Sequence, residues 1–213
     1  MPRRPRPGPV TATAQAPAPA AELQRVARTE GLVPALGLLL EAHGAALPLG
    51  PTGHALLPER DAAPDPVRRY PLPGGAVVLV HDPRAVRDGA RAVDQAALLR
   101  LRLGLLQGLR DDCVAHLAER ASGESTVLLQ QLVKGQLAEA LGHQLELAAL
   151  LDATAPRELT GPVLRDLHSQ VTAVGRVLLR LLGAHGFLAD GPGATAHVSE
   201  LLADVYLHAE EAR

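Results

Sequence analysis

The sequence predicts a mainly α-helical protein, and three observations support this. Hydrophobic residues make up 47% of the 213 residues while aromatic residues make up only 1%. The core is therefore built from Leu, Ala and Val, and Leu and Ala favour helix because they lose little rotamer freedom there. From Val93 onward apolar residues recur with helical spacing over almost the whole remainder. Only one convincing strand signal is present, the β-branched run from Gly75 to Val80.

The N-terminal part divides into three segments. Residues 1–20 hold Pro, Ala, Arg and Thr in irregular order, and such a segment cannot bury enough apolar area to stay ordered, so we expect a disordered tail. Residues 21–60 form a reduced helical segment, in which a helix over 21–46 breaks near Gly31 or Pro34 and ends at a Pro/Gly cluster. Residues 61–92 form a linker that holds the short β-element, with residues 67–72 as its candidate hairpin partner.

Residues 93–213 are expected to form a four-helix bundle, because long helices with short connections pack as antiparallel neighbours. The helices are expected near 93–120, 125–152, 157–183 and 194–211. The first is apolar over more than half its circumference, which predicts burial on two sides. The second begins with Ser125 or Thr126 as N-cap and is expected to bury a stripe of five residues: Leu129, Val133, Leu137, Leu141 and Leu145. The third has a heptad-like seam: Leu164, Leu167, Val171, Val174, Leu178 and Leu181.

A glycine-rich stretch follows the third bundle helix. It reads Leu-Leu-Gly-Ala-His-Gly-Phe-Leu-Ala-Asp-Gly-Pro and spans residues 181–192. Gly183 and Gly186 end the helix, since glycine accepts the left-handed backbone of a C-cap. A turn then places the carboxylate of Asp190 at a loop apex.

This stretch resembles the corresponding segment of the acyl-CoA dehydrogenase family, in which a GGxGF run is followed by a catalytic carboxylate. Gly183, Gly186 and Phe187 match the run. The resemblance covers the C-terminal helical bundle and implies that Asp190 takes the α-proton of an acyl thioester while a β-hydride passes to flavin. Asp is one methylene shorter than the more usual Glu. The other interpretation of Asp190 is that it opens a turn or caps the next helix.

The same resemblance bears on flavin. In the family the first bundle helix ends in an R-x-Q-F-G segment that contacts flavin across a dimer. Arg120 and Gly123 match that segment, and its Gln-Phe pair is missing. Family members also carry a β middle domain, which cannot fit in the linker because a stable sheet needs several strands. We therefore expect FAD, if present, to be shared with a partner subunit, with Arg120, Gly183, Gly186 and Phe187 as cofactor-binding candidates.

Two functional hypotheses follow from the resemblance. The chain is either a compact member or subunit of an FAD-dependent acyl thioester dehydrogenase, or a degenerate, non-catalytic homologue that acts as an oligomerisation partner or scaffold. The implied partners are an acyl-CoA dehydrogenase-type subunit, in a homo- or hetero-oligomer, and an acyl-CoA or acyl-carrier thioester. A formal net charge of −2 gives no reason to expect nucleic acid or an anionic membrane. No apolar run is long enough to cross a bilayer, so a cytoplasmic location is the default expectation.

Other chemistries find little support in the motifs. His116-x-x-Glu119 and His143-x-x-Glu146 each place an imidazole and a carboxylate on one helix face. The order is the reverse of the Glu-x-x-His motif of di-iron bundles, so surface ion pairing is the preferred interpretation and no metal is expected. The sequence has no H-E-x-x-H, C-x-x-C or P-loop. The single Cys113 cannot form an internal disulfide, which suits a reducing compartment.

Overall fold

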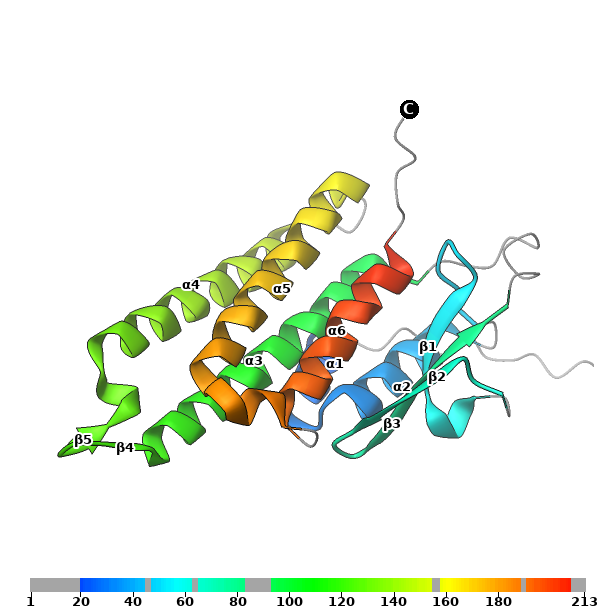
Figure 1. Ribbon diagram of the computed structural model, residues 1–213. Helices are drawn as coiled ribbons and strands as arrows, with labels where there is room; N and C mark the ends of the chain where they lie inside the picture. The colour runs from blue at the N-terminus through cyan, green and yellow to red at the C-terminus, as the bar shows by residue number, and fades with distance from the viewer. Residues whose placement is uncertain are drawn as a thin grey trace, which may run out of the picture.

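The computed structural model describes residues 20–44, 47–62, 65–82, 93–154, 158–188 and 191–207. These residues confirm the mainly α fold, with long helices packed side by side and a small sheet at one end (Figure 1). The predicted disordered tail lies outside the described residues, except for Ala20, which begins the first helix.

The N-terminal segment forms two short helices, α1 and α2, with bounds Ala20–Thr29 and Leu32–His43. The predicted break falls at Gly31, whose φ of 93° lies in the region that favours glycine. Helix α1 packs along the longest helix of the bundle. The N-terminal helices therefore share a core with the bundle, and their buried side chains contact its apolar residues.

A three-stranded antiparallel sheet follows, with strand order β1-β3-β2 and bounds His54–Pro58, Gly75–His81 and Arg68–Leu72 in that order. The hairpin of β2 and β3 confirms the expected pairing, with Arg68 opposite Leu79 and Leu72 opposite Gly75. Strand β1 was not expected, because its five residues stand inside the Pro/Gly cluster that the sequence analysis assigned to a helix end. A short 3-10 helix, η1, covers Glu59–Asp61 between β1 and β2.

The free edge of β1 is sealed by a side chain from the far end of the chain. The Tyr206 hydroxyl accepts a hydrogen bond from the Leu56 N–H at 3.1 Å and donates one to the Leu56 carbonyl at 3.3 Å. Tyr206 is 2% exposed. Because an unpaired strand edge invites pairing with another chain, this contact protects β1 from such pairing.

Helix α3 (Gln95–Glu119) is the central element, and Asp94 caps its N-terminus by accepting from the backbone N–H groups of Ala96 and Ala97. It is buried on two sides, as its apolar breadth predicts. One side, with Leu98, Leu101 and Leu105, contributes to the core with α1, α2 and the sheet, and the other, with Leu99, Leu103 and Leu106 and continuing to Leu117, contributes to the core with α4 and α5. Two glycines allow α1 to approach closely. A Cβ on Gly104 would lie 2.3 Å from the Gln24 carbonyl oxygen, and one on Gly108 would lie 2.9 Å from that of Arg28.

The second bundle helix begins later than expected. Ser122 and Ser125 pair across a two-stranded turn, β4–β5 (Ala121–Ser122 and Ser125–Thr126), and a 3-10 helix η2 (Val127–Leu129) precedes α4 (Gln131–Ala153). The prediction that Ser125 or Thr126 caps this helix was wrong, since Gln130 stands at the N-cap without a side-chain hydrogen bond.

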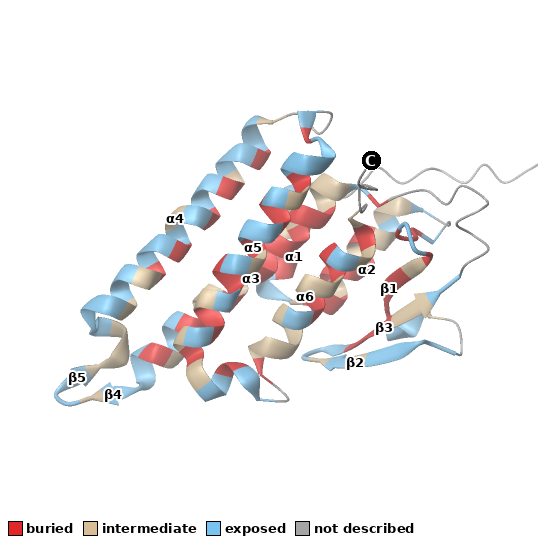
Figure 2. Ribbon diagram, turned by 45° about the horizontal axis from the view of Figure 1, so that its top comes forward, coloured by how far each residue is buried: buried red, intermediate tan, exposed pale blue. Residues whose placement is uncertain are grey.

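The predicted buried stripe of α4 was wrong at three of its five positions, whereas Leu137 is buried and Val133 is partly buried. Leu129, Leu141 and Leu145 are 58%, 40% and 60% exposed, while the buried residues are Leu137, Ala140, Gln144, Leu147 and Leu151. Figure 2 shows α4 at the edge of the molecule with most of its outward surface exposed. The helix is apolar on two faces, and the face that packs against α3 and α5 is the one that contains Gln144.

The last two helices match the sequence pattern. Helix α5 (Gly161–Leu182) buries the predicted seam except for Leu181, which is partly buried. The 3-10 helix η4 (Gly183–Phe187) leads to α6 (Pro192–Tyr206), which packs between α3 and the sheet. Among the described residues, no helix is both long enough and apolar enough to span a bilayer.

Candidate functional site

The glycine-rich segment folds into a tight connection between α5 and α6. Gly183 ends α5 with a φ of 60°, and its N–H donates to the Arg180 carbonyl. A Cβ on Gly186 would lie 3.1 Å from the Leu179 carbonyl oxygen, and one on Gly193 would lie 2.1 Å from the Gly186 carbonyl oxygen. Gly183 therefore serves through its left-handed φ, whereas Gly186 and Gly193 allow η4 to approach both helices closely. Phe187 is 70% exposed.

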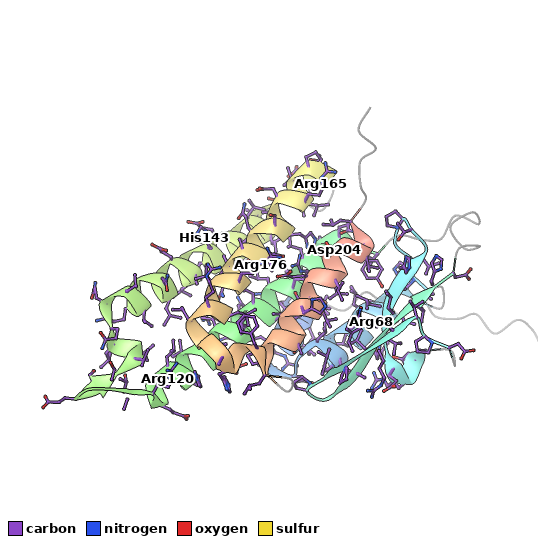
Figure 3. The ribbon with its side chains drawn as sticks, viewed as in Figure 1. Arg68, Arg120, His143, Arg165, Arg176 and Asp204 are labelled. Carbon is purple, nitrogen blue, oxygen red and sulfur yellow. The ribbon has the colours of Figure 1, made fainter. Side chains whose placement is uncertain are left out.

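Stacked imidazoles hold this connection against the C-terminal third of α3. The rings of His116 on α3 and His185 on η4 are parallel within 6°, with centroids 4.2 Å apart. Arg120 follows one turn later, and Figure 3 shows it beside the β4–β5 turn. The 3-10 helix η4, which contains the candidates Gly183, Gly186 and Phe187, therefore lies near the C-terminal end of α3, where Arg120 is the C-cap residue. The proposed catalytic residue Asp190 lies outside the described residues.

A cavity of about 330 Å³ opens between α1, α3, α5 and α6. Its wall combines small and aliphatic residues with a few polar ones, which is the usual character of a ligand pocket. The apolar part includes Ala27, Leu105, Leu106, Leu109, Val171 and Ala196, and the polar part includes Thr172, Thr195 and Ser199 together with four charged residues, Arg28, Arg102, Asp112 and Glu200. Arg120, Gly183, Gly186 and Phe187 do not line this cavity.

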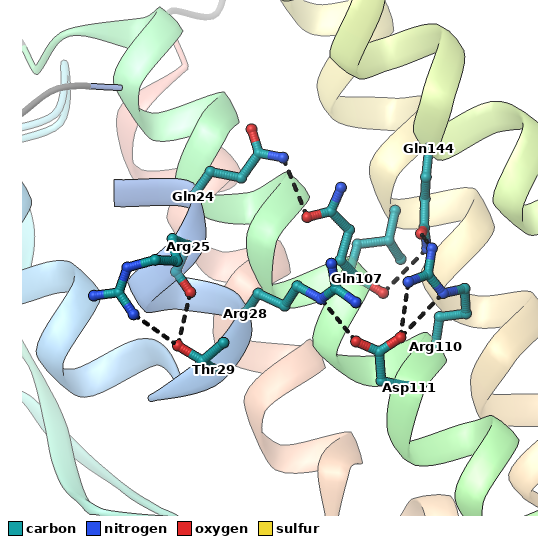
Figure 4. Close-up of polar contacts among 9 residues, drawn as sticks. Gln24, Arg25, Arg28, Thr29, Gln107, Arg110, Asp111 and Gln144 are labelled. Atoms are coloured by element: carbon teal, nitrogen blue, oxygen red, sulfur yellow. Dashed lines mark hydrogen bonds and ion pairs between the residues drawn. The ribbon is translucent and has the colours of Figure 1, made fainter. Parts of the chain in front are cut away.

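Hydrogen bonds between helices fix the α1 side of the cavity (Figure 4). Arg28 of α1 donates to Asp111 of α3 at 2.7 Å. Asp111 also accepts from Arg110, whose Nη1 donates to Gln144 of α4 at 2.7 Å. Gln144 in turn donates to the Leu106 carbonyl at 3.1 Å. This chain of contacts joins α1, α3 and α4 and explains why α4 turns Gln144 inward.

Arg102 lies in the wall of the cavity and is 1% exposed. Its guanidinium donates to Ser199 Oγ at 3.2 Å, to the His168 carbonyl at 3.2 Å and to Thr172 Oγ1 at 2.7 Å. A further bond of 2.8 Å joins Arg102 Nη1 to His168 Nδ1. Burial lowers the pKa of Arg102 to about 10, against the opposing charges of Glu200 and Asp204. The guanidinium therefore remains charged at neutral pH.

The same contacts fix the state of His168. Because a guanidinium can only donate, Nδ1 accepts and the proton of a neutral imidazole resides on Nε2. Burial and the charge of Arg102 lower the pKa of His168 to about 3, so the ring is neutral. His168 Nε2 is buried and has no hydrogen-bond partner among the described residues. An unsatisfied buried donor of this kind is uncommon in folded proteins and marks a special site.

Asp112 supplies a carboxylate at the solvent-exposed rim of the cavity. Its pKa is raised, first by desolvation and then by the charge of Asp111, while His185 opposes the shift. Asp112 lies one turn before His116, whose ring stacks on His185, so the rim adjoins η4. The sequence pattern did not single out Asp112, nor the cluster of Arg102, His168, Thr172 and Ser199. The available signal was an arginine at position 102, inside the apolar stripe of α3.

The flavin expectation can be tested against these positions. Arg120 and Phe187 are exposed, and the sheet has three strands. Gly183 is partly buried and Gly186 is buried, and none of the four cofactor candidates, which lie near one end of α3, lines the cavity. Among the described residues, no three His, Cys, Asp or Glu side chains come together as a metal site would require, and His143 forms an exposed ion pair with Glu146 at 3.5 Å.

No protein-family model matches the chain, and no curated protein matches it either. Among solved structures the chain is similar to a Tcur3481-Tcur3483 steroid ACAD (acyl-CoA dehydrogenase) G363A variant, with 15% sequence identity and a TM-score of 0.46. The similarity covers 71% of this chain and 44% of that chain, so the chain matches less than half the length of this structure. At this identity and TM-score, the similarity assigns neither an activity nor a ligand.

Proposed function

We propose that this chain is an acyl-CoA dehydrogenase-like subunit that binds an acyl thioester in the cavity between α1, α3, α5 and α6. The observation that carries the proposal is the presence of a carboxylate, Asp112, on the rim of a largely apolar cavity beside the glycine-rich segment. A volume near 330 Å³ falls in the range of small-molecule sites. The apolar wall suits an acyl chain.

Two carboxylates are candidates for the base that removes an α-proton. Asp190 is the candidate that the resemblance to the family implies. Asp112 is the candidate that lines the cavity. Its pKa is raised, and a general base that acts near neutral pH requires a shift in that direction. We favour Asp112 for a thioester bound in the cavity, with Asp190 as the second choice.

The flavin side of the reaction is assigned to a partner. Because none of the four residues lines the cavity, we propose that Arg120, Gly183, Gly186 and Phe187 form part of a surface that a second subunit completes. The subunit acts in an oligomer in the cytoplasm, where the buried thiol of Cys113 stays reduced.

A non-catalytic scaffold is the alternative function, and exposed leucines on α4 favour it. Leu141 and Leu145, one turn apart on one side of the helix, are 40% and 60% exposed, and Leu132 and Leu150, on the opposite side, are 75% and 39% exposed. Exposed apolar patches of this kind usually mark interaction sites. A chain that kept these leucines but had no use for the cavity would serve only as an assembly partner.

The experiment that separates the two functions begins with the visible absorbance of the chain, purified alone and co-expressed with any full-length acyl-CoA dehydrogenase homologue of the same source. We expect a flavin band in the complex and its bleaching when butyryl-CoA is added. Asp112→Asn is expected to slow the bleaching at least about a hundredfold, since general base catalysis contributes about that much. Asp190→Asn tests the second carboxylate, and Asp65→Asn, at an exposed position outside the cavity, is the matched control.

The possible outcomes distinguish the catalytic subunit from the scaffold. A complex that stays colourless while both chains remain folded and associated would support the scaffold function. A flavin complex in which both Asp112→Asn and Asp190→Asn react at the wild-type rate would remove the catalytic carboxylate from this chain.

A further inference from the structure

The guanidinium of Arg102 is buried in the wall of the cavity without a carboxylate bound to it. Its hydrogen bonds go to two hydroxyl groups, one backbone carbonyl and one imidazole nitrogen. These partners use four of its five N–H groups, and the fifth, on Nη2, has no partner among the described contacts. Arg is rarely buried unless it is paired, so the site has an unmatched positive charge.

The nearest acidic groups, Glu200 and Asp204, act on this charge only through space, and neither accepts a hydrogen bond from Arg102. Glu200 lines the cavity, but both of its oxygens accept from Arg176, at 3.0 and 2.8 Å. Asp204 lies on α6 and is exposed. Asp112 lies at the rim, beside Asp111 and His185. Arg28, the second arginine of the wall, is bound to Asp111. Arg102 is therefore the buried cation that remains for a ligand.

We infer that the cavity selects an acyl group that ends in a carboxylate, with Arg102 as the residue that receives this carboxylate. The inference rests on the proposed function, because it assumes that the cavity takes the acyl part of a thioester. It names the substrate class as the monothioester of a short dicarboxylic acid. The carboxylate accepts from the unused Nη2 N–H of Arg102, and the methylene groups lie along Leu105, Leu106 and Val171, which line the same cavity.

The charge pattern disfavours other acyl ends. A methyl end would leave the guanidinium without an anion in a low-dielectric wall, where a charge-assisted hydrogen bond is stronger than in water. An ammonium end would be repelled by Arg102. The hydroxyls of Thr172 and Ser199 already accept from Arg102 and can each donate a proton to the incoming oxygen.

The test compares two thioesters of equal reach, S-glutaryl- and S-valeryl-N-acetylcysteamine, which differ in the acid group at the end of the chain. Binding to the full chain is measured by isothermal titration calorimetry at neutral pH. We expect the glutaryl thioester to bind about tenfold or more tightly than the valeryl thioester, since hydrogen bonds to charged groups are the strong ones. Salt should weaken this preference only slightly, because a buried pair is poorly screened.

Three variants identify the residue responsible. Arg102→Gln removes the charge and should abolish the preference, while Arg68→Gln removes an exposed arginine of β2 that does not line the cavity and should keep it. If Arg102→Gln does not fold, Ala196→Leu serves in its place, because it fills the cavity from α6 and leaves the guanidinium intact. Ala196→Leu is expected to weaken both thioesters about tenfold or more.

The outcomes separate this inference from the proposed function. Equal affinity of the two thioesters, or a preference that survives Arg102→Gln, overturns the inference but leaves an acyl site in place. If neither thioester binds, or if Ala196→Leu has no effect on either, then the cavity is not an acyl site and the proposed function loses its substrate.

Discussion

Arg102 and His168 form a buried pair in which one side chain sets the protonation state of the other. The arginine can only donate, so the imidazole accepts at Nδ1 and stays neutral. The pair is surrounded by groups from two helices: Thr172 from α5, and Ser199, Glu200 and Asp204 from α6. Arg102 itself lies on α3. The neutral ring makes the stability of the protein depend on pH.

We expect the protein to lose stability as the pH falls below the ordinary histidine value of 6.5. Above that pH the ring is neutral in both the folded and the unfolded chain. Below it the unfolded chain takes up a proton that the folded chain refuses until about pH 3. The free energy of unfolding should then fall by about 1.4 kcal/mol per pH unit from this group.

The measurement is urea denaturation of the wild type and of His168→Asn between pH 7 and pH 4, the window that the two pKa values set. Asn keeps an acceptor near the place of Nδ1 and cannot titrate. The wild type should lose more stability than the variant as the pH falls, whereas the exposed His143→Asn control should follow the wild type. Parallel profiles for the wild type and His168→Asn would contradict the assignment.

The close packing of α1 on α3 depends on glycine at two positions of one helix. Gly104 and Gly108 are four residues apart on α3, and a Cβ at either would meet the backbone of α1. Glycine in a helix normally costs stability relative to alanine. Here that cost is offset by the contact between the helices, which contributes to the shared core of Leu23, Ala27, Leu101 and Leu105.

Alanine is therefore expected to have opposite effects on two helices. Gly104→Ala should lower the free energy of unfolding by about 1–3 kcal/mol, since overpacking forces the helices apart. Gly135→Ala on α4, where a Cβ meets nothing within 4 Å, should raise it by up to about 1 kcal/mol. Urea denaturation of both variants checks the pair, and a shift in the same direction for both would refute the packing argument.

The sequence correctly predicted the buried face of those helices that have only one apolar face. Helix α5 has one apolar seam, so Leu164, Leu167 and Val171 could be placed in the core in advance. Helix α4 has two, and periodicity alone does not tell the face of Leu141 and Leu145 from the face of Ala140 and Leu147. Contacts with Arg110 and Leu106 decide it, because they draw Gln144 inward.

The candidate site was less accessible to sequence reasoning. The left-handed backbone of Gly183 could be predicted from local chemistry, because a helix C-cap favours glycine, whereas the same prediction for Gly186 was wrong, since Gly186 has no positive φ and instead allows a close approach to Leu179. The polar cluster could not be predicted, since Arg102, His168 and Ser199 come from three different helices and meet only through the fold. Strand β1 could not be predicted for a similar reason, because its five residues form a strand only when β3 and Tyr206 supply hydrogen bonds to their backbone groups.

At the scale of the whole molecule, α4 presents an apolar surface that the described residues leave uncovered. Ala138, Leu141, Leu145 and Ala149 recur at intervals of three or four and are all exposed. Gly142 lies within the same stripe, and a Cβ there would contact nothing. Small residues between leucines allow another helix to pack closely, so this face is the expected contact of an oligomer.

We expect the purified chain to sediment as a species larger than its 22.3 kDa mass. Leu145→Glu should return it to the monomer, because a charge on an apolar interface must be desolvated without a partner. Circular dichroism should show unchanged helix content, since Leu145 is outside the core. Gln131→Glu adds the same charge at an exposed polar position of α4 and should keep the assembly. A wild type that is monomeric at every concentration would rule out self-association through α4.

The bond between Tyr206 and Leu56 also constrains how the protein is made. The two residues are 150 positions apart, so β1 emerges from the ribosome long before the side chain that seals its edge. During that interval the nascent chain presents an open strand flanked by unburied Leu and Val side chains, and such intermediates are prone to aggregate. Completion of α6 is thus the step that ends the vulnerable period. Synthesis that stalls before α6 would leave a chain that depends on chaperones, whatever the intrinsic stability of the finished fold.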